Sequence, residues 1–171
     1  NLYEKAYHMY KNTEEDKNCV YQNYKANLPS NGFEFAKEDI ISYGRKAYQS
    51  SSSEYSHSEA EAERVLNLLP RGHFSIHTNM EDNPWWMLDL ACVMYVKNIY
   101  IFDRPDLGGA RSLNMEVSIS SDMTAWKVIY IKEDPSVMWN VQIPLGEEAR
   151  YVKVSLPSKG MIHLDTVIVT Q

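Results

Sequence analysis

Four ionisable residues near the middle of the chain, three of them in one short polar loop, are of types that suit a polar binding site. His77 is followed after 26 residues by Arg104, then by Asp106 and, after four more residues, by Arg111. A guanidinium group presents a planar fork of N–H donors that can hold two adjacent hydroxyl oxygens. An imidazole can donate or accept a hydrogen bond, according to its tautomer. These groups therefore suit a ligand with neighbouring hydroxyl groups, such as a monosaccharide.

The loop between the two arginines contains residues that can hold its shape. We expect Asp106 to hydrogen-bond backbone amides or an arginine, since two close guanidinium groups repel each other. Gly108 and Gly109 allow positive φ and let the loop fold back tightly. Hydrogen bonds to charged groups contribute about 1.5–3 kcal/mol each, so three such groups give useful affinity even in a shallow site.

Other kinds of chemistry find less support in the sequence. No nucleophile elbow, phosphate-binding glycine loop or pair of catalytic carboxylates is present, so we predict no enzyme. His73 and His77 are four residues apart but lack a third ligand, and we predict no metal site. A structural role remains the alternative for a histidine such as His77. His163 and Asp165 share one face of a strand and are expected to pair there or to face solvent.

Size and composition are those of one globular domain. The chain has 171 residues, of which 44% are hydrophobic, and this is enough for one sizeable core. The net charge is −6 and no basic cluster occurs, which argues against nucleic acid or an anionic membrane surface as partner. The most apolar stretch, residues 87–102, is interrupted by Asp89, Lys97 and Asn98, so it does not suit a transmembrane helix.

The two cysteines, Cys19 and Cys92, cannot form a disulfide framework. Cys92 stands among apolar residues and is expected to be a small buried hydrophobe. A bridge to Cys19 would require the N-terminal segment to lie against the main domain. The chain begins at Asn1 without a leader pattern, so a signal peptide is either already removed or was never part of it. Cysteine usage does not identify the compartment.

From residue 40 onward the chain consists of short apolar or alternating segments separated by turn residues. The alternation is clear where Met115, Val117 and Ile119 are interleaved with Glu116, Ser118 and Ser120. One buried face and one wet face with a period of two predict antiparallel sheet. Residues 59–69 have a helix-favouring composition. The predicted strands are residues 47–51, 74–77, 86–90, 93–102, 112–120, 125–131, 138–145, 149–156 and 161–170. The pattern predicts an all-β fold, a β-sandwich or jelly roll.

Residues 1–40 differ from the rest and predict a helical N-terminal extension or linker. Leu2 and Ala6 lie at helical spacing, and Thr13 with Asp16 has the pattern of a capped helix start. Residues 28–32 then break the helix. This extension is expected to pack on the main domain, residues 41–171, or to lead into it from a neighbouring one.

Six segments of residues 41–171 resemble, in the right order, the discoidin domains, which are the type C domains of coagulation factors V and VIII. Residues 44–51 resemble "GKPAxQSS", residues 83–90 "NPWWxVDL" and residues 99–104 "VxIYNR". Residues 118–126 resemble "VSxDGxxW", and residues 149–154 and 164–169 resemble the closing strands "ARYVRV" and "LxEVEV". The resemblance implies a galactose-binding-domain-like jelly roll. Trp85 and Trp86 could be platforms for a sugar, but the "NPWWxVDL" context favours core packing for Trp86.

One branch of that superfamily, the fucose-binding F-type lectins, is similar in a sharper way. Its sugar motif is His, 26 residues, Arg-x-Asp, four residues and then Arg or Lys, and this chain matches every specified position. The resemblance implies that His77, Arg104 and Arg111 bind the sugar. Many F-type lectins follow Arg-x-Asp with a vicinal cysteine pair, where this chain has Leu107 and Gly108. Leu107 could still supply an apolar contact.

The site predicted from these arguments comprises seven residues and no cofactor. Its members are His77, Arg104, Asp106, Leu107, Arg111 and, from the bordering loop of residues 52–58, Glu54 and Tyr55. F-type lectins also hold a structural calcium through Asn and Asp residues before the histidine. Here the corresponding region offers only Asn67 and scattered glutamates, and Asp165 could serve a remnant of that calcium site.

We therefore predict a non-catalytic carbohydrate-binding module that recognises a monosaccharide such as fucose or galactose on a glycan or glycoconjugate. The alternative is an accessory, adhesion-type interaction domain of a larger, carbohydrate-active protein, with another domain of the same parent chain as its partner. A membrane-docking module ranks last, because its loop tips would offer only Tyr55 and Leu107 as apolar groups. The family resemblance alone implies a secreted or cell-surface protein.

Overall fold

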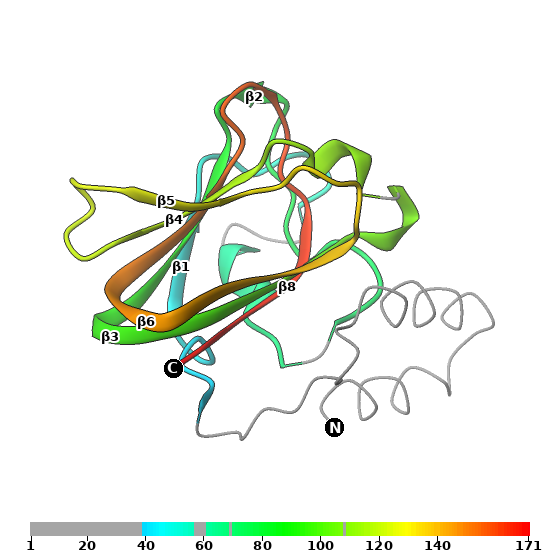
Figure 1. Cartoon of the computed structure of the whole chain (residues 1–171). Coiled ribbons are helices and arrows are strands. Elements are labelled where there is room, and N and C mark those ends of the chain that lie inside the picture. Colours follow the sequence, from blue (N-terminus) through cyan, green and yellow to red (C-terminus); the bar gives the residue numbers. More distant parts are fainter. Residues whose placement is uncertain (1–38, 57–60, 69, 108) are drawn as a thin grey trace.

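β-Strands are the main regular structure in the described part of the chain (Figure 1). The computed structural model describes residues 39–56, 61–68, 70–107 and 109–171. The strands are β1 (Lys46–Gln49), β2 (Glu81–Asp82), β3 (Trp85–Asp103), β4 (Glu116–Ser120), β5 (Lys127–Ile131), β6 (Met138–Ser155), β7 (Lys159–Gly160) and β8 (Leu164–Thr170). All of their pairings are antiparallel, and the predicted β-sandwich fold is confirmed. The helices predicted within residues 1–38 lie outside the described residues.

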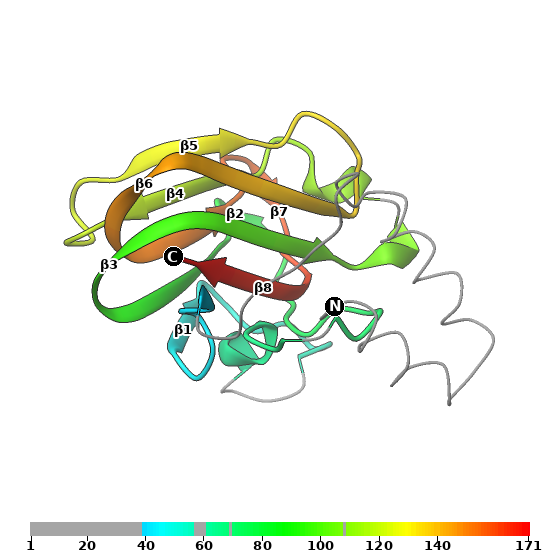
Figure 2. The same ribbon diagram turned by 60° about the horizontal axis from the view of Figure 1, so that its bottom comes forward.

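Two long, bent strands connect the two layers of the sandwich. The first half of β3 pairs with β1 on one side and with the second half of β6 on the other. In the same layer β6 pairs with β4, and β4 pairs with β5. The second half of β3 pairs with β8 and with the first half of β6. Figure 1 and Figure 2 show β3 and β6 curling together at the end where they turn from one layer into the other.

The sequence prediction was wrong in dividing β3 and β6 into two strands each. The pairing of β3 with β6 is interrupted between Asp89 and Met94, where Ala91 has a φ of 72°. The Asp89 carboxylate accepts a hydrogen bond from the Ala91 amide (2.7 Å) and two from the Arg150 guanidinium (2.8 and 2.9 Å). A bulge supported in this way bends the strand without ending it.

Cys92 lies in this bulge and is exposed, so its predicted burial was wrong. Ala91, Cys92 and Val93 are all exposed because the strand leaves the sheet here to change layer. Apolar neighbours in the sequence do not guarantee burial where a strand bulges. Cys19 lies outside the described residues.

The core fills the space between the two layers. Leu88 and Leu90 of β3 are fully buried with Ile99 and Ile101 of the same strand, and Val167 of β8 belongs to the same cluster. The predicted alternation is confirmed for the apolar positions Met115, Val117 and Ile119, which are all buried. Ser118 and Ser120 are buried as well, contrary to the prediction of a wet face, because β4 lies between two other strands whose larger side chains flank these small serines.

Trp86 belongs to the core, as predicted. Its side chain is fully buried, and its indole N–H donates to the carbonyl of Ala62 (2.8 Å). Trp85, the next residue, is only half-buried. The first tryptophan of the NPWW sequence therefore faces outward, and the second anchors β3 to the 3-10 helix η2 (Glu61–Val65).

Two further local predictions were wrong. Among the described part of residues 59–69, the predicted helix is limited to the 3-10 turn η2. Residues 74–77 form no strand, although the amides of Ser75 and Ile76 both donate to the carbonyl of Leu164 (2.7 and 3.2 Å). This segment follows the beginning of β8 without regular pairing. No helix in the described part of the chain is long and apolar enough to cross a membrane.

Candidate functional site

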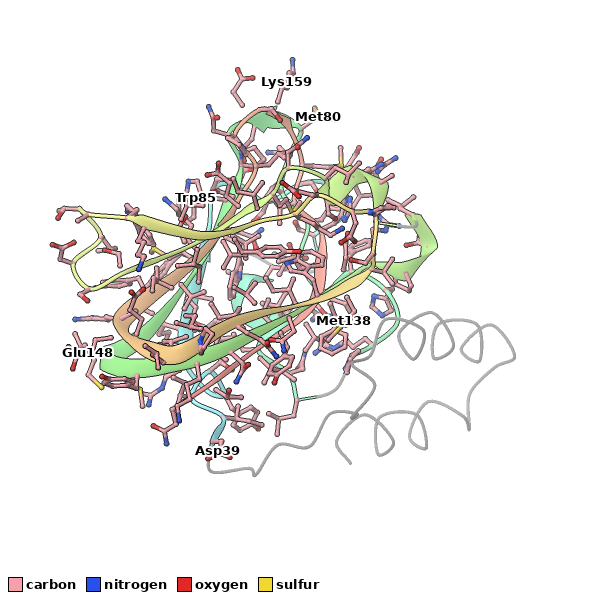
Figure 3. The ribbon with its side chains drawn as sticks, in the orientation of Figure 1. Asp39, Met80, Trp85, Met138, Glu148 and Lys159 are labelled. Carbon is pink, nitrogen blue, oxygen red and sulfur yellow. The ribbon has the colours of Figure 1, made fainter. Side chains whose placement is uncertain are left out.

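The predicted site residues gather at the end of the sandwich where β3 ends and β8 begins. The arginine loop, residues 104–111, follows β3 and contains the 3-10 turns η3 (Pro105–Leu107) and η4 (Ala110–Ser112). Figure 3 shows Met138 at this end of β6, whereas Glu148 lies at the opposite end, where β3 and β6 bend. Met138 pairs with Phe102, just before the arginine loop.

His77 is buried within a group of aromatic rings. Only 4% of it is exposed, and its ring centroid lies 5.2 Å from that of Phe74, 5.3 Å from that of Tyr55 and 5.6 Å from that of His163. Burial lowers the pKa of His77 below its ordinary value, and the positive charge of Arg104 acts in the same direction. His77 is therefore neutral at physiological pH.

The tautomer of His77 follows from its neighbours. Its Nδ1 lies 2.8 Å from the carbonyl oxygen of Thr78 and 3.1 Å from the hydroxyl oxygen of Ser53. A carbonyl oxygen only accepts, so in the neutral ring the proton is on Nδ1. The other ring nitrogen, Nε2, is then a hydrogen-bond acceptor.

Arg104 is immobilised on two sides. Its Nε and Nη2 donate to the two carboxylate oxygens of Asp106 (2.7 and 2.6 Å), and its guanidinium carbon lies 4.8 Å from the centre of the Phe74 ring. This bidentate bond lowers the pKa of Asp106. Of the two roles expected for Asp106, the structure shows the pairing with an arginine. A guanidinium has five N–H donors, so Asp106 uses only part of what Arg104 can offer.

Arg111 is exposed on η4 and contacts a different segment. Its Nη1 lies 3.9 Å from the sulfur of Met161, two residues before His163. Gly109, directly before η4, has a φ of 71°, as expected for this loop. Leu107 is half-buried, and Gly108 lies outside the described residues.

The loop predicted to border the site contacts His77 through its backbone and its hydroxyl groups. The Ser53 amide and the Ser56 hydroxyl both donate to the carbonyl oxygen of His77 (3.0 Å each). These bonds bring Tyr55 against the His77 ring, although Tyr55 itself is exposed. Glu54, its neighbour, is exposed as well, and residues 57 and 58 lie outside the described part.

Sequence reasoning missed a buried group behind these residues. Asp103, the last residue of β3, is fully buried, and one of its oxygens accepts the amide hydrogen of Arg104 (2.8 Å). The same oxygen lies 3.0 Å from Nδ1 of His163, and the other oxygen accepts the hydroxyl hydrogen of Ser112. The available signal was an acidic residue that ends an apolar strand, since a buried carboxylate requires hydrogen-bond donors nearby.

The expectation that His163 and Asp165 pair with each other or face solvent was wrong, because both are fully buried and bind other segments. The two oxygens of Asp165 accept the amide hydrogens of Arg71 (2.7 Å) and Gly72 (2.6 Å). This carboxylate supports a loop through amide donors, and its part in a remnant calcium site stays a prediction. The described residues contain no group of three or more His, Cys, Asp or Glu that could hold a metal ion.

Comparison with solved structures finds lectin modules of the same fold. A histidine mutant of the lectin binding domain of Lectinolysin, complexed with Lewis b, is 30% identical with a TM-score of 0.64, over 81% of this chain and 99% of that chain. A fucolectin from Morone saxatilis (striped bass) serum is 25% identical with a TM-score of 0.68, over 76% of this chain and 47% of that one. A Streptococcus pneumoniae fucose binding module, 23% identical, is similar in fold, with a TM-score of 0.67 over 80% of this chain and 99% of that one.

A search of curated proteins finds no match. The model of the F5/8 type C domain family, in contrast, matches residues 46–164, which include β1 to β7, His77 and the arginine loop. With this match and the antiparallel sandwich, the chain belongs to the F5/8 type C (discoidin) domain family.

Proposed function

We propose that this protein is a non-catalytic carbohydrate-binding module that binds a terminal monosaccharide of a glycan through His77, Arg104 and Arg111. The observation that carries the proposal is the fixed guanidinium of Arg104, held by Asp106 and Phe74 in the neighbourhood of a neutral His77. A donor and an acceptor that are held rigidly against the same Phe74 ring need little reordering when they bind hydroxyl groups.

Each group has a distinct role in this proposal. Nε2 of His77 accepts a hydrogen bond from one sugar hydroxyl, and the N–H groups of Arg104 donate to the oxygens of its neighbours. Arg111, which is exposed, adds donors from the other end of the arginine loop. Leu107 and Tyr55 contribute apolar surface for the C–H face of the sugar, and Glu54 borders the site. Fucose is the first candidate, because the F-type lectin motif is matched and similar structures are of fucose-binding and Lewis b-binding modules; galactose is the second.

Titration calorimetry with L-fucose and D-galactose, together with a glycan array, tests this proposal. Arg104→Ala and Arg111→Ala should each weaken binding about tenfold or more, since each removes at least one hydrogen bond from a charged donor. Arg45→Ala is the matched control. Its guanidinium bonds the carbonyl of Ile41, near the start of β1, and should be irrelevant to the sugar.

Equal binding by the wild type and both loop variants would contradict the proposal. An array on which the folded wild type binds no glycan would favour the alternative, an accessory domain for protein association within a larger, carbohydrate-active protein.

A further inference from the structure

Asp103 connects the two ends of the arginine loop. Arg104 follows Asp103 directly, and its amide donates to one carboxylate oxygen (2.8 Å). Ser112 follows Arg111 directly, and its hydroxyl donates to the other oxygen. Asp103 and Ser112 are fully buried, so this connection lies beneath the loop and out of contact with solvent.

His163 joins this connection to the rest of the site. Its Nδ1 lies 3.0 Å from the Asp103 oxygen that also accepts the Arg104 amide. Since a carboxylate only accepts, Nδ1 is the donor. The His163 ring is fully buried, 5.6 Å from the ring of His77, and Met161 in the same segment contacts Arg111. One segment therefore contacts the His77 ring, Asp103 and Arg111.

Burial of a carboxylate costs free energy unless hydrogen-bond donors surround it. The structure around Asp103 is therefore stable only in the arrangement that keeps these donors in place. The discoidin pattern "VxIYNR" has an uncharged Asn at the position of Asp103, which would need no such compensation. Here Arg104, Ser112 and His163 each supply a donor, so the donors include groups from both ends of the loop and from the residue just before β8. Movement of either arginine relative to His77 would remove a donor from the carboxylate.

We propose that Asp103, held by His163, is the positioning residue that sets where Arg104 and Arg111 stand relative to His77, and that it thereby sets the affinity for neighbouring hydroxyl groups. This inference rests on the proposed function. Asp103 and His163 touch no sugar themselves. They act by keeping the three binding groups at one spacing before the ligand arrives.

The test is calorimetry with L-fucose on the full chain. Ser112→Ala removes only one hydroxyl and should raise Kd about tenfold. Ser75→Ala is the matched control, because Ser75 is fully buried but its hydroxyl has no hydrogen-bond partner among the described residues. Its Kd should stay within about twofold of the wild type.

His163 provides a rescue experiment. His163→Leu removes the donor to Asp103 and should raise Kd about tenfold or more, whereas His163→Asn places an amide N–H where Nδ1 was and should restore Kd to within about threefold. A purely structural role would not distinguish these variants by Kd once each is shown to be folded. The Nε–H signal of Arg104 in NMR spectra gives a second readout, which should shift in Ser112→Ala and not in Ser75→Ala.

The two proposals fail in different ways. If the wild type binds fucose and both Ser112→Ala and His163→Leu bind it equally well, the role of Asp103 is overturned and the sugar site stands. If His163→Leu does not fold, Ser112→Ala alone decides. If the folded wild type binds neither fucose nor galactose, the proposed function is overturned and the positioning role for sugar binding with it.

Discussion

At the scale of single residues, His77 combines burial with a nearby positive charge. Its proton is on Nδ1, its ring touches Tyr55 and Phe74, and Arg104 lies close enough to lower its pKa. A protonated His77 would lose its acceptor and would also bring a second positive charge next to Arg104. The charge of Arg104 therefore favours the neutral imidazole, and the proposed role of His77 as an acceptor requires it.

We expect His77 to make the protein less stable in mild acid. Its pKa in the unfolded chain is near the ordinary 6.5 and is lower in the folded protein, so between these values the unfolded chain binds more protons. Its contribution to the free energy of unfolding is fully present above pH 6.5 and falls as the pH drops from there to the folded pKa. Urea unfolding should be measured for the wild type and for His77→Gln from pH 7.5 to 5. Over this range the free energy of unfolding should fall less in the variant than in the wild type.

If the free energy of unfolding changed equally with pH in both proteins, this prediction would be contradicted. The two carboxylates that are paired with arginines, Asp106 and Asp89, do not disturb the comparison. The pKa values of Asp106 and Asp89 are lowered by their arginine partners, so the stability that these two residues contribute is lost only as the pH falls below 3.8.

At the scale of elements, the arginine loop is held from outside as well as from beneath. A Cβ on Gly109 would lie closer than 3.0 Å to the carbonyl oxygens of Pro135 and Ser136. That neighbouring loop is itself anchored by Lys132, whose buried ammonium donates to the carbonyl of Asp134 and lies 4.9 Å from the Trp139 ring centre. The backbone at Gly109 therefore packs directly against the backbone of residues 134–136, with no room for a side chain between them.

Gly109→Ala should destabilise the protein and weaken sugar binding. Its left-handed φ of 71° costs alanine about 1–2 kcal/mol, and displacement of the opposing backbone costs about 1–3 kcal/mol more. Gly44→Ala is the matched control, because Gly44 has a φ of 73° but nothing lies within 4 Å of its added Cβ. Thermal unfolding should show a clearly larger loss for Gly109→Ala, and Kd for fucose should rise only in that variant. Equal losses would mean that the close approach does not matter.

At the scale of the whole molecule, the sequence predicts the fold class better than the path of the chain. Alternation identifies strands because the side chains of a sheet alternate between core and solvent, and it correctly assigned Val117 and Ile119 to the core. The resemblance to "NPWWxVDL" did the same for Trp86. It cannot show that two apolar runs are one bent strand, because the bend of β3 depends on the pairing of Asp89 with Arg150, which is 61 residues away. The exposure of Cys92 follows from the same long-range contact.

The candidate site shows the same limit. The resemblance to the F-type lectin motif singled out His77 and Arg104, and the structure brings both against the Phe74 ring. His163 was singled out as well, but with the wrong partner. Its true partner, Asp103, lies 60 residues earlier in the chain and becomes a neighbour only when β8 pairs with β3.

We expect residues 39–171 to fold and to bind as the full chain does. Ile40 pairs with Thr170, the Ile41 amide donates to the carbonyl of Val169 (2.9 Å), and Ile41 belongs to the core. A chain that begins at Asp39 should therefore keep its Tm within about 3 °C and its Kd for fucose within about twofold. A chain that begins at Ser42 loses both isoleucines and should melt at a distinctly lower temperature. A large loss already in the chain from Asp39 would instead show that residues 1–38 pack on the domain.

The two ends of the described region meet at one point, since the amide of Gln171 donates to the carbonyl of Asp39 (2.9 Å). The seven residues of β8 separate this point from His163, a length of about 20 Å in an extended strand. A protein fused at Asp39 or at Gln171 would be attached at this point, whereas the proposed sugar site lies near the other end of β8. Because these two ends are adjacent, residues 39–171 can be inserted into a loop of a host protein at little entropic cost.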